Sequence, residues 1–294
     1  MNKAIVGLGE ILWDVFPERK VLGGAPANFA YHVSQFGFDS YTVSAIGNDD
    51  LGQDILDSLE DKGLRYLVEK TGFATGTVDV TVDRRGVPHY NIHKNVAWDN
   101  IPFTEKTREL ARNAQAVSFG SLAQRNLVSR KTIKEFLSAM PQGSLKIFDI
   151  NLRQDFYTKE IIHESLQWAN VLKINDEEII VLAGLYGWKG RSEQDICKDI
   201  LEQYKLDIVI LTKGTEGSFV FTRKETSYQS TPKVHVADTV GAGDSFTAAF
   251  VVSYLHGDRI ADAHQLAVEV SAYVCTQHGA MPVLPDAYRE LFKK

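Results

Sequence analysis

A glycine-rich segment that contains two acidic residues lies near the end of the 294-residue sequence. It reads Asp-Thr-Val-Gly-Ala-Gly-Asp-Ser-Phe over 238–246, and a helical pattern follows it. Gly241, Ala242 and Gly243 carry little or no side chain, so their backbone N–H groups can approach a ligand closely. Free N–H groups at a helix N-terminus bind anions, and the helix dipole assists them. The segment is therefore a candidate site for holding a phosphoryl group during its transfer.

Asp244, within this segment, has two interpretations on spacing alone. Aspartate is a common N-cap, so its carboxylate could accept a hydrogen bond from the first turn of the helix. A carboxylate beside a bound phosphate could instead be the general base that takes a proton from an attacking hydroxyl. Both interpretations remain open at this point.

A second glycine-containing segment, Leu-Gly-Gly-Ala-Pro-Ala-Asn-Phe-Ala, occupies residues 22–30. Pro26 suits the first turn of a helix. Gly24 lets a ligand approach the backbone, and the amide of Asn28 can donate to and accept from a hydroxyl. An ordinary junction between a loop and a helix would have the same composition, so this segment alone does not define a site.

Several other enzyme classes lack support in the sequence. The chain contains no Gly-Lys dipeptide and hence no phosphate-binding loop of the GxxxxGK[ST] type. The Gly-Leu-Gly at 7–9 is not followed by the third glycine of a dinucleotide-binding fingerprint, because Leu12 stands there. Cys197 and Cys275 show no metal-binding or disulfide spacing, and we expect both to be buried thiols.

Charge and hydropathy exclude further classes of partner. The 38 acidic and 32 basic residues give a formal net charge of −6, so we expect no nucleic-acid partner. No apolar run approaches the ~20 residues that cross a bilayer, and the first residues are unlike a signal peptide. We therefore expect no membrane association and a cytoplasmic location.

Apolar runs alternate with stretches of helical period along most of the chain. After an opening run at 3–12, strands are expected at 40–47, 116–121, 145–151, 170–175, 207–212 and 217–221. Helices are expected at 51–62, 104–115, 129–140, 159–168, 175–185, 192–204, 242–255 and 262–276. This alternation predicts an α/β fold with a mainly parallel sheet covered by helices on both faces.

One segment, 77–92, has a different period. Val78, Val80 and Val82 alternate with polar residues before Arg85-Gly86, as in a half-exposed antiparallel hairpin. Such a hairpin within a parallel α/β chain predicts a small appendage such as a lid, and an edge hairpin without a role is the alternative. We find no repeat and no linker, so the sequence predicts one domain with an inserted lid.

Taken together, the segments at 23–30 and 238–246 resemble the two signatures of the PfkB, or ribokinase-like, family of carbohydrate kinases. Their order and separation also match, and the resemblance covers nearly the whole chain, 1–294, with a lid from segments near 10–22 and 72–100. It implies a three-layer αβα fold and transfer of the ATP γ-phosphate to a sugar hydroxyl. By this resemblance Asp244 is the base, and the anion hole is formed by Gly241, Ala242 and Gly243.

The resemblance also implies roles for other residues. Asp14, Gly24 and Asn28 correspond to sugar-binding positions. Asn175 and Glu178 match an NxxE motif that organises Mg²⁺ and phosphate, although the same pair reads as a helix capping box. The nucleotide-side loop at 212–217 makes Thr212, Gly214 and Gly217 candidates for ATP contact. Asp238, with the turn near Gly279, resembles a monovalent-cation site, so K⁺ is a candidate cofactor beside ATP and Mg²⁺.

The choice of sugar rests on two further segments. Asp-Ile-Asn-Leu-Arg at 149–153 resembles the fructokinase and 2-keto-3-deoxygluconate kinase branches, in which Arg153 would contact the substrate, although it could also pair with a surface acid. Tyr90 follows the hairpin toward the sugar, whereas His93 is expected to be structural. Fructose is the leading substrate. Ribose, 2-keto-3-deoxygluconate, a nucleoside and a non-catalytic regulator are the alternatives, and the resemblance allows a homodimer formed through the lid.

Overall fold

A sheet of nine strands forms the centre of the computed structural model, which describes residues 3–82 and 88–292. The strands are β1 (Ala4–Leu8), β4 (Ser40–Gly47), β5 (Arg65–Thr71), β8 (Ala114–Phe119), β9 (Leu145–Asp149), β10 (Val171–Asn175), β11 (Ile208–Thr212), β12 (Ser218–Phe221) and β13 (Thr226–Gln229). Their spatial order is β13-β12-β11-β10-β9-β8-β1-β4-β5. All neighbours pair in parallel except β11 with β12 and β12 with β13.

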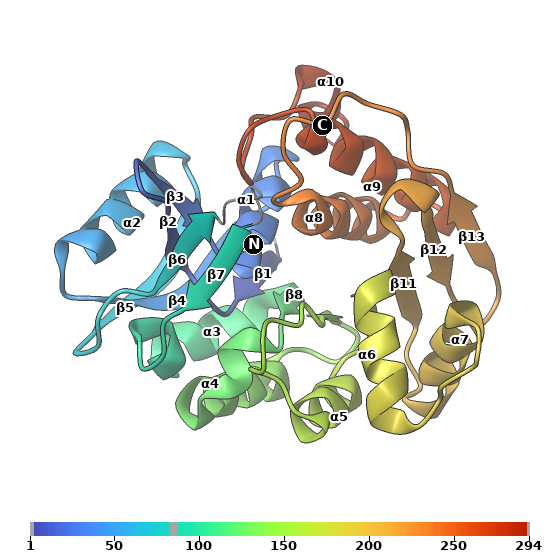
Figure 1. Ribbon diagram of the computed structural model, residues 1–294, viewed down its shortest axis with the longest axis horizontal. Helices are drawn as coiled ribbons and strands as arrows, with labels where there is room; N and C mark the ends of the chain where they lie inside the picture. Colours follow the sequence, from blue (N-terminus) through green and yellow to red (C-terminus); the bar gives the residue numbers. More distant parts are fainter. Residues whose placement is uncertain (1–2, 83–87, 293–294) are drawn as a thin grey trace.

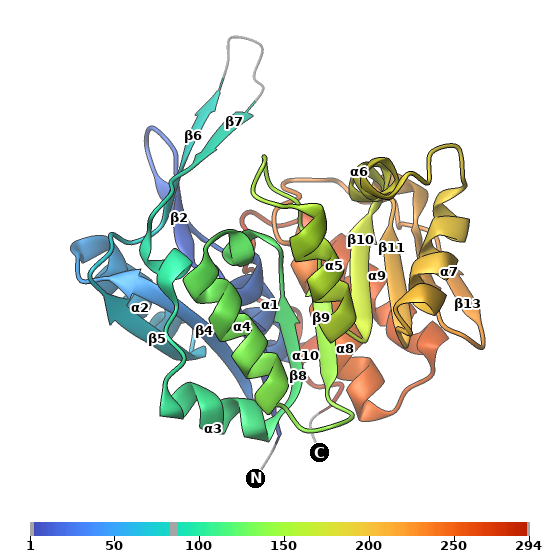
Figure 2. The same ribbon diagram turned by 90° about the horizontal axis from the view of Figure 1, so that it is seen from below.

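Helices cover both faces of this sheet, as Figures 1 and 2 show. One face carries α1 (Ala25–Gln35), α2 (Asp50–Asp61), α8 (Ala242–His256) and α9 (Ile260–Cys275). The other carries α3 (Glu105–Asn113), α4 (Leu127–Ala139), α5 (Lys159–Trp168), α6 (Asp176–Tyr186) and α7 (Glu193–Gln203). A short helix, α10 (Asp286–Arg289), lies near the end of the chain.

The central strands are mostly apolar because both of their faces are buried. In β1, Val6 and Leu8 pack into the core on one side, while Ile5 packs into the core beneath α1 and α8. The predicted α/β class, with a mainly parallel sheet between two helical layers, is confirmed. No helix in the described part of the chain is long and apolar enough to cross a membrane.

A second sheet of four strands stands apart from the large one. It consists of β3 (Lys20–Gly23), β2 (Leu12–Val15), β6 (Thr77–Val82) and β7 (Pro88–Ile92), in the order β3-β2-β6-β7. The predicted hairpin is present as the antiparallel pair β6 and β7, although its expected turn at Arg85-Gly86 lies outside the described residues. Val78 and Val80 are buried on one face of this pair. Figure 2 shows β6 and β7 projecting beyond one edge of the large sheet.

The small sheet continues directly from β1 of the large sheet. β2 begins four residues after β1 ends, so the small sheet stands at the carboxyl edge of the parallel strands. β2 pairs with β6 in parallel and with β3 in antiparallel orientation. This edge is where parallel α/β sheets bind their ligands.

Candidate active site

Charged side chains converge at the carboxyl edge of the large sheet. Asp149 ends β9, Lys173 is the middle residue of β10, and Glu10 follows β1. With Asp244 from α8, the two acids Glu10 and Asp149 line a small cavity of about 10 Å³, roughly the room that one water molecule needs. Lys173 donates to Asp149 at 3.2 Å from within the same region. Residues from four separate parts of the chain therefore meet at this edge.

Asp244 lies in the first turn of α8, but it does not cap the helix. The N-cap position is Gly241, and no side chain caps this end. The Asp244 carboxylate instead accepts a hydrogen bond from Nδ2 of Asn28 at 2.7 Å. The capping interpretation is therefore wrong, and the two glycine-containing segments meet although 216 positions separate Asn28 from Asp244.

The surroundings of Asp244 hold its pKa above the usual value for aspartate. Burial is the main cause, and the nearby Asp149 adds to it, so the pKa is raised to about 6. The Asn28 hydrogen bond, Lys173 and Arg153 act in the opposite direction. A carboxylate with this pKa is mostly ionised at pH 7 and still accepts a proton more readily than an ordinary aspartate.

The loop before α8 fits tightly against its neighbours. Gly241 has φ = 78°, and a Cβ atom there would lie 2.6 Å from the carbonyl oxygen of Ala280. A Cβ atom at Gly243 would lie 3.0 Å from Nζ of Lys173. Glycine at these two positions therefore allows the loop to begin the helix while the loop packs against the backbone of Ala280 and the buried ammonium group of Lys173.

The first glycine-containing loop is equally close to its surroundings. Gly24 has φ = 117° and is the N-cap of α1, with Pro26 in the first turn as predicted. A Cβ atom at Gly24 would lie 2.4 Å from the carbonyl oxygen of Glu10, and one at Gly23 would lie 2.6 Å from Oδ2 of Asp14. The two glycines thus let this loop pack directly against the segment that carries Glu10 and Asp14.

Asp14 and Arg153 lie close enough to this edge for their charges to interact. Burial raises the pKa of Asp14 to about 6, and Arg153 acts against that rise. The guanidinium of Arg153 is exposed and also lowers the pKa values of Glu10 and Asp244. The positive charge of Arg153 therefore acts on three acids, Glu10, Asp14 and Asp244, and not on a single surface acid.

Tyr90 and His93 lie at the end of the small sheet. The Tyr90 side chain on β7 is half exposed, and its carbonyl oxygen accepts from Nε2 of Gln154 at 2.6 Å. His93 pairs through Nε2 with Asp79 at 2.7 Å on the neighbouring strand. Tyr90 is thus free to contact a ligand, whereas His93 has a structural partner within the small sheet.

Asn175 and Glu178 form a capping box at the start of α6. Oδ1 of Asn175 accepts from the Glu178 backbone N–H at 2.8 Å, and Oε2 of Glu178 accepts from the Asn175 N–H at 2.9 Å. Oε1 of Glu178 also accepts from the N–H of Leu152 at 3.0 Å. The capping interpretation is confirmed, and the same carboxylate holds the segment that carries Arg153.

The remaining predicted residues lie in two further loops. Thr212 ends β11, and Gly214 and Gly217 follow with φ values of 49° and 112°. Asp238 accepts hydrogen bonds from the N–H groups of Val240 at 3.0 Å and Gly279 at 3.1 Å. The structure therefore brings Asp238 and the turn at Gly279 together, as the sequence resemblance implied.

Three buried charged residues of this region had no role in the sequence-based prediction: Glu10, Asp149 and Lys173. Burial raises the pKa of Glu10 to about 7, and Asp244 contributes to that rise. Burial alone would lower the pKa of Lys173, but the surrounding carboxyls outweigh burial and raise it. The available signal was a charged residue within an otherwise apolar run, since the expected runs at 3–12, 145–151 and 170–175 each contain one of them.

Because the Glu10 carboxyl is buried, we expect it to make the free energy of unfolding depend on pH. A pKa above the usual 4.5 means that the folded state binds the proton more tightly, so stability is lost as pH rises from about 4.5 to 7. Glu10→Gln removes this loss. Between pH 5 and pH 8, the wild type should lose roughly 2 kcal/mol more unfolding free energy than the variant. Urea unfolding of the wild type and the variant at both pH values measures this difference, with Glu202→Gln at an exposed position as the control. The same pH dependence of stability in the wild type and in Glu10→Gln would contradict the prediction.

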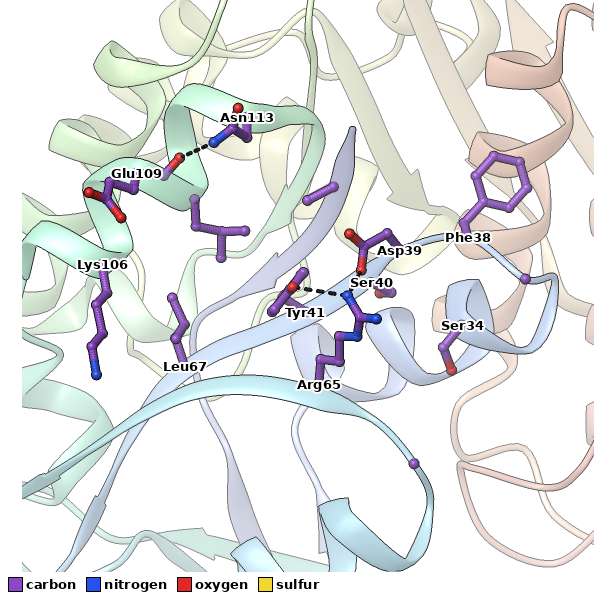
Figure 3. Close-up of a pocket in the computed structure, with 14 residues that line it drawn as sticks. Ser34, Phe38, Asp39, Ser40, Tyr41, Arg65, Leu67, Lys106, Glu109 and Asn113 are labelled. Atoms are coloured by element: carbon purple, nitrogen blue, oxygen red, sulfur yellow. Dashed lines mark hydrogen bonds and ion pairs between the residues drawn. The ribbon is translucent and has the colours of Figure 1, made fainter. Parts of the chain in front are cut away.

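A much larger cavity, of about 700 Å³, lies at the opposite edge of the large sheet. Ala4, Ser40 and Arg65, which begin or lie close to the amino ends of β1, β4 and β5, contribute to its wall. Figure 3 shows the Arg65 guanidinium directed toward Asp39 and Tyr41, to which it donates at 2.6 and 3.2 Å. This cavity is therefore separate from the cluster of acids around Asp244.

Comparison with known proteins agrees with this geometry. The profile of the pfkB family of carbohydrate kinases matches residues 10–287. A fructokinase from Escherichia coli is 27% identical over 305 residues, which cover 97% of each chain. The structure of an uncharacterised sugar kinase from Pyrococcus horikoshii in complex with ATP is 25% identical with a TM-score of 0.79, and the match covers 95% of this chain and 93% of that one.

A fructokinase from Vibrio cholerae, solved with fructose, ADP and a calcium ion, shares the fold. It has a TM-score of 0.82 at 24% identity, and the match covers 100% of this chain and 99% of that one. The chain belongs to the pfkB family of carbohydrate kinases and is an ATP-dependent carbohydrate kinase.

Proposed function

We propose that the protein transfers the γ-phosphate of ATP to a hydroxyl of fructose, with Asp244 as the general base. The observation that carries this proposal is the hydrogen bond from Asn28 to Asp244, which joins the two glycine-containing loops around one carboxylate. Asn28, Asp14 and Gly24 then bind the sugar, and the loop at 241–243 holds the phosphoryl group.

The proposed reaction needs positioning and charge neutralisation more than covalent chemistry. Asp244 takes the proton of the attacking sugar hydroxyl while the O–P bond to the sugar forms and the bond to ADP breaks. The N–H groups at the start of α8 face the transferring phosphoryl group and stabilise its charge. Arg153 contributes the positive charge that faces the acids of the sugar site.

ATP binds on the side of Thr212, Gly214 and Gly217 in this proposal, and Mg²⁺ neutralises the phosphate charge. Among the described residues, no three His, Cys, Asp or Glu side chains group as a metal site. This fits Mg²⁺, which keeps several waters and binds phosphates with one or two carboxylates. Asn175 and Glu178 would hold it through water, although both Glu178 oxygens already accept N–H groups.

A monovalent cation is a further proposed cofactor. Asp238 accepts from the N–H groups of Val240 and Gly279 and so ties together two loops beside α8. A variant of the Vibrio cholerae fructokinase was solved with a potassium ion. We therefore propose K⁺ for this chain, bound near Asp238.

Fructose is proposed over other sugars because several relatives at about 27% identity are named fructokinase. A same-class alternative is ribose, 2-keto-3-deoxygluconate or a nucleoside, since Arg153 suits a carboxylate as well as a hydroxyl. A regulator that binds sugar and nucleotide without transfer is disfavoured by the raised pKa of Asp244 within an intact site.

A substrate panel tests the choice of sugar. We expect ADP release, measured with a coupled assay at pH 7, to give the highest kcat/KM with fructose among fructose, ribose, 2-keto-3-deoxygluconate and adenosine. One missing hydroxyl contact typically lowers kcat/KM by one to several orders of magnitude, so the ranking should be clear. A higher kcat/KM for any other member of the panel would reject fructose while keeping the kinase.

We further propose that the whole chain is one kinase domain and that the small sheet acts as its lid. The sheet projects from the edge where the sugar would bind, so closure would exclude water that competes as phosphoryl acceptor. The outer face of the same sheet is the proposed surface for a homodimer. Sedimentation velocity tests the dimer, and a single monomer boundary across concentrations would reject it.

A further inference from the structure

A buried arginine, Arg125, lies between the small sheet and the segment that carries Arg153. It is the last residue of η2 (Leu122–Arg125), the short helix that follows β8. Its side chain is only 8% exposed. The sequence analysis gave it no role, because it belongs to none of the motifs.

The guanidinium of Arg125 holds η1 (Ala97–Asn100) through a two-pronged contact. Nε donates to Oδ1 of Asp99 at 2.7 Å, and Nη2 donates to Oδ2 at 2.9 Å. Asp99 is itself 2% exposed and accepts from the N–H of Val96 at 3.2 Å. Paired charges of this geometry are rigid, and neither partner can be removed alone without leaving a buried charge unpaired.

The same guanidinium reaches the end of the small sheet. Nη2 also donates to the carbonyl oxygen of His93, the residue that follows β7. The His93 N–H in turn donates to the carbonyl of Thr77, the first residue of β6. Arg125 therefore holds the base of the β6–β7 pair, where its two strands join the rest of the molecule.

Arg125 also contacts the segment after β9. Its Cζ atom lies 4.0 Å from the ring centroid of Trp98 and 4.5 Å from that of Phe156. Phe156 closes a turn onto Arg153, since its N–H donates to the Arg153 carbonyl at 3.1 Å. Gln154 from the same turn donates to the Tyr90 carbonyl on β7. We call the segment 153–156 the Arg153 turn. The small sheet and the Arg153 turn are thus joined at two points, Gln154 and Arg125.

The backbone at these two segments enters the left-handed region. Asn95, Asn151 and Gln154 have φ values of 58°, 40° and 48°, a region that asparagine tolerates and glutamine seldom adopts. Nη1 of Arg125 is buried and finds no acceptor among the described residues. Strained backbone and an unsatisfied buried donor persist where function compensates for their cost.

We propose that Arg125 is a positioning residue that fixes the base of the small sheet relative to the Arg153 turn, and so sets how both close on the sugar. This inference rests on the proposed function, because it assigns the small sheet as the lid over a sugar. Lysine cannot replace Arg125, since an ammonium group lacks the planar fork and the stacking face.

The test uses the full-length protein with Arg125→Lys, and with Arg125→Met combined with Asp99→Asn so that no buried carboxylate is left unpaired. With the best sugar of the panel, we expect KM for the sugar to rise about tenfold and KM for ATP to stay within twofold. We also expect more than one ADP per sugar phosphate, because water enters an ill-placed site. Arg130→Met is the control, since Arg130 bonds only to the nearby Gln124 carbonyl among the described residues.

A second readout does not depend on the sugar. Amide hydrogen exchange over 90–98 should accelerate at least tenfold in both Arg125 variants and stay unchanged in Arg130→Met. Unchanged exchange, or a loss of active protein with KM and stoichiometry as in the wild type, would overturn the inference. A wild type that phosphorylates no sugar of the panel would instead reject the proposed function, while the exchange result would still decide the anchoring role of Arg125.

Discussion

Asp244→Asn should lower kcat for sugar phosphorylation by about 10²–10⁴-fold, the usual contribution of a general base. The amide has nearly the shape of the carboxylate and can still accept the hydrogen bond from Asn28, so the fold should remain intact. It cannot take a proton from the sugar hydroxyl. Because the phosphoryl-binding N–H groups are unchanged, KM for ATP should change little. Steady-state kinetics with fructose measures the loss.

The pH profile separates loss of the base from loss of structure. The wild-type kcat/KM should fall about tenfold per pH unit below about 6, as the Asp244 carboxylate becomes protonated. This acid limb should be absent from the residual activity of Asp244→Asn. Asp262→Asn is the matched control, because Asp262 lies in the first turn of the neighbouring helix α9 and, within the described part of the chain, its carboxylate pairs only with Arg259. Near-wild-type turnover in Asp244→Asn would remove Asp244 from the mechanism.

Gly241→Ala should reduce kcat by about 10²-fold or more, the size of effect seen when one oxyanion donor is removed. The new Cβ would lie 2.6 Å from the Ala280 carbonyl oxygen, in a backbone conformation with φ = 78°. The loop must therefore shift, and the N–H groups at the start of α8 then leave the position of the phosphoryl group. Kinetics with urea unfolding on the same samples measures both effects.

Gly187→Ala is the matched control for Gly241→Ala. Gly187 ends α6 with φ = 75°, but a Cβ atom there would meet nothing within 4 Å. It introduces the same backbone strain, of about 1 kcal/mol, without the clash. We expect lower stability and unchanged kcat. If Gly241→Ala retained the kcat of the control, the loop would not be the phosphoryl-binding element.

The sequence was most informative where an element carries a regular apolar pattern. The almost fully buried strand at 40–47 was predicted to the residue as β4, and the helix at 159–168, which buries one face, matches α5. In contrast, β5 is half exposed at the sheet edge and β2 and β3 are four residues long, so their patterns were too weak to identify. The short antiparallel strand β13 was missed for the same reason.

Site residues that belong to sequence motifs were predicted, whereas residues that join the site only through tertiary contacts were missed. Asp244 and Asn28 were chosen from their loops, but only the fold shows that they bond to each other. Glu10 and Arg125 were assigned no role from the sequence. Their burial and partners depend on chain segments up to 234 positions away, as for Glu10 and Asp244, which no local pattern encodes.

The central claim is that one carboxylate-based site couples the release of ADP to the phosphorylation of a sugar. The most direct measurement follows ADP and sugar phosphate together in one reaction with ATP, Mg²⁺ and fructose at pH 7. Our account predicts one fructose phosphate for each ADP in the wild type and neither product above background in Asp244→Asn. Release of ADP without any phosphorylated sugar, across the whole substrate panel, would contradict it.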